Sequence, residues 1–122
     1  MDIERFWIDV LQQNADALSA YFQKDAVVNW HCTNERFTVE EFIRANCEYP
    51  GKWAGEIERK HCLDDLIITV LRVYSVDNSA SFHVTSFIKV QDGKICSIDE
   101  YWGDDGPAPQ WRLEKHLGVP IR

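Results

Sequence analysis

The second half of the chain alternates between strand-forming segments and tight turns, and this alternation limits the possible folds more than any other feature. Four segments are rich in β-branched and aromatic residues and have only short polar turns between them: 53–62, 66–76, 80–90 and 95–102. Asp92-Gly93, between the last two, is a strong hairpin signal. Strands joined this closely pair with their neighbours along the chain, so we expect an antiparallel meander.

The first 50 residues show helical spacing instead. Three N-cap signals precede apolar residues that recur every three or four positions: Asp2, Asn14, and Thr38 with Glu41 as a capping box. Between the second and third helices, segment 26–32 is predicted to form one short strand and segment 33–36 a turn. Helices followed by a run of long strands indicate an α+β domain.

Length and charge exclude several classes of protein. The chain has 122 residues and is predicted to be a single domain over 1–122, with 103–122 as an extended C-terminal tail. Its net charge of −7 argues against a partner of nucleic acid or an anionic membrane, since both require a basic surface. No apolar run approaches the ~20 residues that span a bilayer, and the acidic N-terminus does not resemble a signal peptide. We therefore expect a cytoplasmic protein.

The cysteines and histidines do not form a metal-binding pattern. His31-Cys32 and His61-Cys62 are adjacent pairs, but neighbouring strand residues point to opposite faces and cannot chelate one ion. The cysteines are expected to be free, buried thiols: Cys32, Cys47, Cys62 and Cys96. No metal and no cofactor are predicted.

Three sequence segments, in this order and spacing, are similar to those of a known superfamily. They are the helix-to-strand join at 21–30, the capped helix start at 38–42, and the closing hairpin formed by 92–95 and 99–102. The chain resembles the nuclear transport factor 2-like superfamily in its SnoaL-like and ketosteroid-isomerase-like branch. The resemblance implies a cystatin-like α+β barrel: a cone-shaped, curved, mixed but mainly antiparallel sheet wrapped by three N-terminal helices around a small-molecule pocket. It also implies homodimers formed through the outer face of the sheet, where Thr85, Phe87 and Tyr101 would point.

The resemblance also allows one specific chemistry to be tested. It places the base of a ketosteroid isomerase at Trp30, the tyrosine donor at Phe6 or Trp7, and the second donor near Ser86. None of these side chains can replace a carboxylate base or an acidic donor. We therefore do not expect steroid isomerisation.

Strand alternation, together with the resemblance, predicts which residues share the cavity. On the last strand Cys96 and Ile98 would face inward with Glu100 and Trp102, and Ile95 would face outward. The predicted ligand-binding residues are Trp7, Trp30, Cys32, Ser86, Ile98 and Trp102. Glu100 is the predicted catalytic acid or base, because burial among aromatic rings raises the pKa of a carboxyl group. Two alternatives remain open: a salt bridge from Glu100 to Arg59 or Arg72, and a register shift that puts Asp99 inside.

These observations predict a protein with a pocket that binds a small apolar or aromatic molecule. If the protein is an enzyme, it would transform that molecule. The chemistry would be acid–base catalysis of the isomerase, cyclase or hydratase type without a cofactor. The alternative is a non-catalytic dimeric scaffold of the same fold. The tail, with Pro107, Pro109 and Trp111, is predicted to cover the sheet or the pocket mouth, or to dock on a dimer partner.

Overall fold

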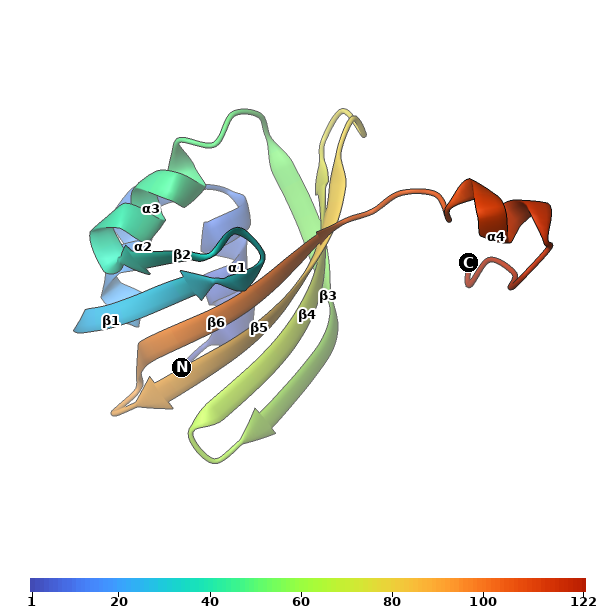
Figure 1. Ribbon diagram of the computed structural model, residues 1–122. Helices are drawn as coiled ribbons and strands as arrows, with labels where there is room; N and C mark the ends of the chain where they lie inside the picture. Colours follow the sequence, from blue (N-terminus) through green and yellow to red (C-terminus); the bar gives the residue numbers. More distant parts are fainter.

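The computed structural model describes residues 1–122 and shows one curved six-stranded sheet whose concave side is covered by three helices (Figure 1). The covering helices are α1 (Ile3–Leu11), α2 (Ala15–Leu18) and α3 (Val39–Cys47). The strands are β1 (Phe22–Trp30), β2 (Glu35–Thr38), β3 (Trp53–Leu63), β4 (Leu66–Ser75), β5 (Ser81–Gln91) and β6 (Lys94–Asp104). A last short helix, α4 (Gln110–Glu114), lies away from the sheet. The α+β class and the cone-like sheet predicted from the sequence are confirmed.

The sheet has the order β2-β1-β6-β5-β4-β3. Strands β3 to β6 pair antiparallel with their chain neighbours, as the short turns predict. Strand β1 pairs parallel to β6 and makes the sheet mixed. The prediction of a turn at 33–36 is wrong in part: Asn34 takes a left-handed conformation with φ of 57°, and the chain then returns along β1 as β2.

One face of the last strand differs from the prediction. The register shifts between Lys89 and Val90 where β5 pairs with β6, so alternation is interrupted at the start of β6. Ile95 is therefore fully buried, although it was expected to face outward. Cys96, expected inside, is only partly buried, and its thiol donates to the carbonyl oxygen of Lys89 at 3.4 Å. Beyond this irregularity Ile98 and Glu100 are buried, as predicted.

The core lies between the helices and the concave face of the sheet. Its fully buried members are Phe6, Leu18, Val28, Leu71, Val84, Ile88, Ile95 and Ile98. The cysteines are free, but they are not buried as expected: Cys32 and Cys62 are exposed, and Cys47 and Cys96 are partly buried. None of the helices has both the length and the apolar character needed to cross a membrane.

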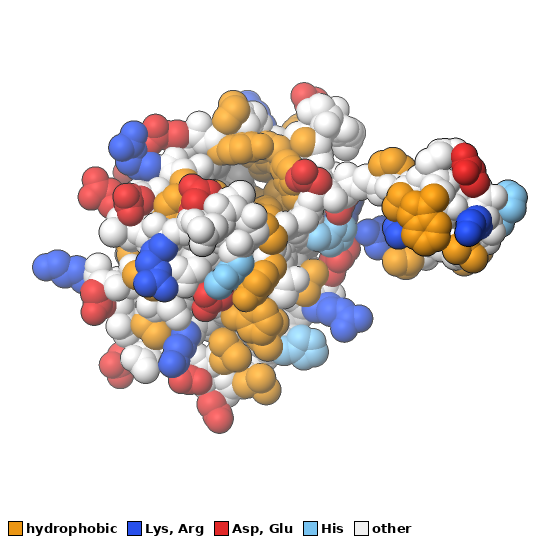
Figure 2. All heavy atoms as spheres, in the orientation of Figure 1, with side chains coloured by type: hydrophobic (Ala, Val, Ile, Leu, Met, Phe, Trp, Pro, Cys, Tyr) orange, Lys and Arg blue, Asp and Glu red, His pale blue; other side chains and the backbone are white.

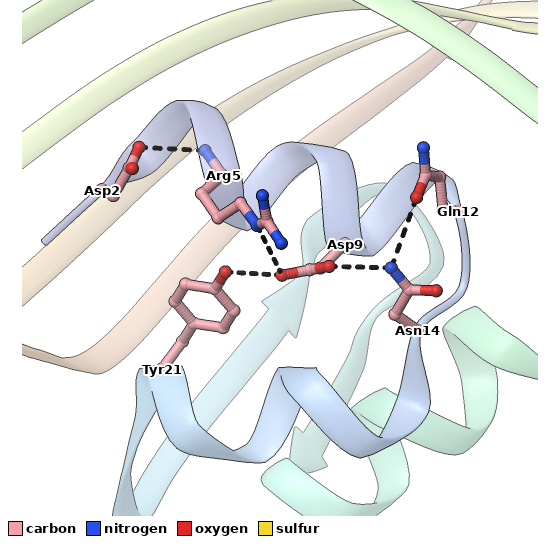
Figure 3. Close-up of polar contacts among 6 residues, drawn as sticks. All are labelled: Asp2, Arg5, Asp9, Gln12, Asn14 and Tyr21. Atoms are coloured by element: carbon pink, nitrogen blue, oxygen red, sulfur yellow. Dashed lines mark hydrogen bonds and ion pairs between the residues drawn. The ribbon is translucent and has the colours of Figure 1, made fainter.

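A buried carboxylate joins the first two helices (Figure 3). Asp9 on α1 is 4% exposed and accepts hydrogen bonds from Tyr21 Oη at 2.5 Å and from Asn14 Nδ2 at 2.8 Å. The hydrogen bond from Tyr21 lowers the pKa of Asp9, and burial raises the pKa of Tyr21. Because the Asn14 side chain is used in this way, it forms no capping bond at α2, unlike Asp2 at α1 and Thr38 at α3.

The C-terminal segment 105–122 extends away from the domain as an arm (Figure 1). Every residue from 103 to 122 is exposed, and the hydrogen bonds of residues 106–122 all lie within the arm. The prediction that this segment covers the sheet or the pocket mouth is therefore wrong. Gly103 and Asp104, assigned to the tail from the sequence, are the last residues of β6.

A histidine on the outer face of the sheet holds the start of the arm. His83 Nδ1 contacts Asp105, His83 Nε2 lies 3.1 Å from Glu58 Oε1, and Arg72 is the register partner of His83 on β4. Asp105 also accepts a hydrogen bond from Ser81 Oγ, and its amide donates to the Ser81 carbonyl at 3.0 Å. These contacts fix the direction in which the chain leaves β6.

The contacts of His83 should make the anchor of the arm sensitive to pH. The hydrogen bond with Asp105 raises the pKa of His83 above its ordinary 6.5. The stabilisation from the charged ring is therefore fully present below about pH 6.5 and is lost as the pH rises through the raised pKa. We expect Asp105→Asn to move the His83 titration, followed by NMR of its ring protons, back toward 6.5. A titration unchanged by D105N would contradict the assignment.

Candidate ligand-binding cavity

A cavity of about 300 Å³ opens between the helices and the concave face of the sheet. Figure 2 shows hydrophobic side chains gathered around a hollow in the upper part of the view. Eleven of its 15 lining residues are hydrophobic, and the rings among them are Trp7, Trp30, Tyr49, Trp53, Phe82 and Trp102. The polar side chains that line it are Gln13, Thr33, Asn46 and Asp104. The lining contains no Lys or Arg.

Trp102 stands at a steep angle to two other rings of the cavity. Trp30 and Trp102 have centroids 6.2 Å apart at 68°, and Trp102 meets Phe82 at 82°. Trp53 continues the wall from Phe82 at a centroid distance of 5.5 Å and a shallower angle of 39°. Because Trp102 is set edge to face with Trp30 and Phe82, aromatic faces border the cavity on several sides. Such a cavity suits a compact apolar, aromatic or cationic molecule.

Glu100 lies behind this wall and does not line the cavity. Its carboxylate is 2% exposed and accepts hydrogen bonds from Trp30 Nε1 at 3.0 Å and from Ser86 Oγ at 2.5 Å. The strand register brings the three together, because Glu100 pairs with Trp30 across β1–β6 and with Ser86 across β5–β6. No Lys or Arg pairs with Glu100, and Arg72 lies instead against Glu56 at 4.0 Å. The suggested salt bridge to Arg59 or Arg72 does not form.

A third donor is directed toward the same carboxylate. Trp102 Nε1 is fully buried and forms no hydrogen bond within ordinary geometry, yet it lies close enough to favour the charged form of Glu100. Desolvation has the opposite and larger effect and raises the pKa of Glu100 above its ordinary 4.5. The site is thus a buried carboxyl group surrounded by neutral donors, two of which belong to indoles that line the cavity.

The buried polar row continues across the sheet beneath the cavity. Ser86 pairs with Thr69 on β4, and both are completely buried. Trp7 on α1 donates from Nε1 to Thr69 Oγ1 at 3.2 Å. Trp7, Trp30 and Trp102 therefore direct their N–H groups toward the buried polar residues behind the lining. The apolar surfaces of these rings remain facing the cavity.

The structure brings together part of the predicted site. Trp7, Trp30, Cys32 and Trp102 line the cavity, whereas Ser86 and Ile98 are fully buried and lie outside its lining. Asp99 faces outward and bonds His31 and Asn29, so it is Glu100 that points inward. Lining residues outside the predicted ligand-binding set are Val10, Leu11, Gln13, Thr33, Ala45, Asn46, Tyr49, Trp53, Val73, Phe82 and Asp104. The available signal for Phe82 was strand alternation, which puts it on the same face of β5 as Ser86. The available signal for Trp53 was a tryptophan at the start of β3.

No group of three His, Cys, Asp or Glu side chains is placed to hold a metal ion. His31 and Cys32 are neighbours in a 3₁₀ turn rather than on a strand, and His31 stacks on Tyr101 at 4.6 Å on the outer side of the sheet.

Comparison with known proteins gives structural similarity alone. No family model and no curated protein sequence match the chain. A candidate ketosteroid isomerase from Kribbella flavida has a TM-score of 0.80 at 19% identity, over 98% of this chain and 87% of that one. An NTF2-like protein of unknown function from Burkholderia xenovorans has a TM-score of 0.76 at 21% identity, over 97% and 92%. A ketosteroid-isomerase-like fold from Catenulispora acidiphila, in complex with trimethylamine, has a TM-score of 0.66 at 15% identity, over 82% and 84%.

These similarities confirm the predicted resemblance at the level of the fold. The first two alignments also reach the arm, because residues 1–104 make up only about 85% of the chain and the alignments cover 98% and 97% of it.

Proposed function

We propose, from the nuclear transport factor 2-like fold of this chain, that its function is to bind a compact apolar or aromatic molecule in the tryptophan-lined cavity. One observation carries the proposal: a cavity of about 300 Å³ whose walls are aromatic stays open while the core around it is closely packed. This volume is at the lower end of the range for small-molecule sites. A scaffold protein has no need of such a cavity, and its interior would be filled by side chains.

The charges around the cavity favour neutral or positively charged ligands. Asp104 is the one carboxylate in the lining, no cationic side chain faces the cavity, and the chain carries a net charge of −7. Aromatic faces attract an organic ammonium group through the ring quadrupole. The trimethylamine complex of the Catenulispora protein is in line with this preference. An anionic ligand would gain no ion pair and would lose its hydration.

Acid–base catalysis by Glu100 is the second candidate function. Burial raises the pKa of Glu100 above its ordinary 4.5, and a raised pKa suits a carboxyl group that acts as a general acid or base. However, the indoles of Trp30 and Trp102 stand between this carboxyl group and the cavity, so one of them would have to move before a proton could reach a ligand. In its present arrangement Glu100 is a positioning residue that orients the two indoles.

Ligand titrations monitored by tryptophan fluorescence and by NMR test the proposed function. We expect indole and tetramethylammonium to bind, and benzoate to bind at least about tenfold more weakly because its charge would be desolvated. Trp53→Ala removes a wall and should weaken indole binding about tenfold or more. Leu63→Ala is the matched control, since Leu63 is 56% exposed at the end of β3 and lies outside the cavity lining. Equal effects of W53A and L63A, or no binding of any probe, would refute the proposal.

A further inference from the structure

The arm presents an apolar surface that has no partner within its own chain. Five large apolar residues of the arm are half exposed or more: Trp111 at 55%, Leu113 at 50%, Leu117 at 54%, Val119 at 87% and Ile121 at 95%. Figure 2 shows hydrophobic side chains gathered on the visible side of the arm. Exposed apolar surface of this density marks an interaction site.

The arm is held in a direction that keeps it off its own sheet. Asp105 is fixed by Ser81 and His83, and the following Pro107 and Pro109 favour an extended backbone. Residues 106–109 can span about 13 Å before α4 begins, at about 3.3 Å per residue. The apolar residues of α4 therefore lie away from the sheet and helices of their own chain.

A second unpartnered apolar surface lies on the convex face of the sheet. Phe87 on β5 is the register partner of Ile68 on β4, and the ring of Phe87 meets that of Tyr101 edge to face at 6.1 Å. Tyr101 is 45% exposed, and Ile68 and Phe87 are partly exposed. We call this surface, made of Ile68, Phe87 and Tyr101, the outer patch.

The charge distribution suits contact between the arm and another copy of the domain. Residues 106–122 carry Arg112, Lys115 and Arg122 against one acid, Glu114, which is a net charge of +2. Because the whole chain has a net charge of −7, residues 1–105 have a net charge of −9. A basic arm is attracted to the acidic domain of a second molecule, whereas two domains alone would repel each other.

We propose that the arm of one molecule docks on the outer patch of a second copy of this chain, so that two copies hold each other by reciprocal exchange of their arms. The contact follows two-fold symmetry, in which the same arm and the same patch are used twice. Trp111 is the central anchor, because a large ring flanked by leucines makes a strong contact when it is desolvated. The resemblance implies that two sheets pair through this face. In the arrangement proposed here, the arm of the second copy covers the outer patch instead. The proposal does not depend on ligand binding in the cavity.

Sedimentation velocity over a range of concentrations tests the role of the arm. We expect a dimer for the natural chain, and a dissociation constant at least about 30-fold higher for the double variant Trp111→Asp with Leu117→Asp. Both side chains are half exposed on the arm, whose hydrogen bonds all lie within residues 106–122, so the fold of the domain should be retained, with unchanged circular dichroism and melting. Val76→Asp is the matched control: Val76 is 61% exposed but lies at the β4–β5 turn. A monomeric natural chain, or a double variant that dimerises as tightly as the natural chain, would overturn the proposal.

Cross-linking tests the surface that receives the arm. A photoreactive benzoylphenylalanine in place of Leu113, in a mixture of ¹⁴N- and ¹⁵N-labelled full-length chains, should give isotopically mixed products between the arm and peptides of β4, β5 or β6. Products within one chain, or mixed products on any other surface, would show that the outer patch is not the docking site.

Discussion

Replacing Glu100 by Gln is expected to make the folded protein more stable at neutral and alkaline pH while keeping its structure. The wild-type carboxyl group is completely buried without a cation, and burial raises its pKa above 4.5. Stability from the protonated group is therefore fully present below about pH 4.5 and is lost as the pH rises through the raised pKa. The amide of Gln cannot ionise. Its oxygen can accept from Trp30 and its NH₂ can donate to Ser86 Oγ, so the hydrogen bonds can be retained.

Urea unfolding at several pH values measures this effect. At pH 8 the free energy of unfolding of E100Q should exceed that of the natural chain by about 1–3 kcal/mol. The two plots of this free energy against pH should converge toward pH 4.5. Ser86→Ala is the control: it removes a donor from the carboxylate and keeps the charge, so it should lower stability most at high pH. A natural chain and an E100Q variant with parallel pH profiles would show that Glu100 does not titrate in the folded state as its burial requires.

Gly55→Ala is expected to be the most destabilising exchange of a small residue in this chain. A Cβ at position 55 would lie 2.5 Å from the carbonyl oxygen of Arg72 and 3.3 Å from Leu11 on α1. The backbone of β3 or β4 would have to move, and overpacking of this kind costs about 3 kcal/mol. We expect the melting temperature to fall by about 10 °C. Because Leu11 lines the cavity, affinity for indole should fall as well.

Gly103→Ala is a matched control for this exchange. Gly103 is also a strand residue, on β6, but a Cβ there would meet nothing within 4 Å. Its substitution should be neutral or slightly stabilising, because Ala has less freedom than Gly in the unfolded chain. Similar losses for G55A and G103A would mean that the close approach of the Arg72 carbonyl oxygen on β4 and of Leu11 on α1 is not what limits position 55.

The features of the fold that depend on local chemistry could be predicted from the sequence. The capping box of Thr38 and Glu41, the Asp92-Gly93 turn and the period of two on β4 and β5 each act over a few residues. Features that depend on pairing between distant segments could not. The shift at Lys89 and Val90 reverses the faces of two residues on β6, and no local signal marks it.

The same distinction applies to the cavity. Alternation indicated that Glu100 and Trp102 share a face, and this follows from strand geometry alone. The position of Glu100, behind the indoles rather than beside a ligand, depends on side-chain rotamers in three strands. Sequence periodicity does not predict rotamers. The contributions of Leu11 and Tyr49 to the lining come from the way α1 and the segment after α3 pack on the sheet, which is likewise tertiary information.

The parallel pairing of β1 with β6 has a consequence for the time course of folding. The bond between Trp30 and Glu100 joins residues 70 positions apart, and β1 has no other long-range strand partner. During synthesis on the ribosome, the helices and β1 emerge first. Strand β1 cannot pair with β6 until nearly the whole domain has been synthesised. Contacts of such long sequence separation slow folding. The wall of the cavity formed by Trp30 and Trp102 is therefore expected to be among the last parts of the molecule to assemble.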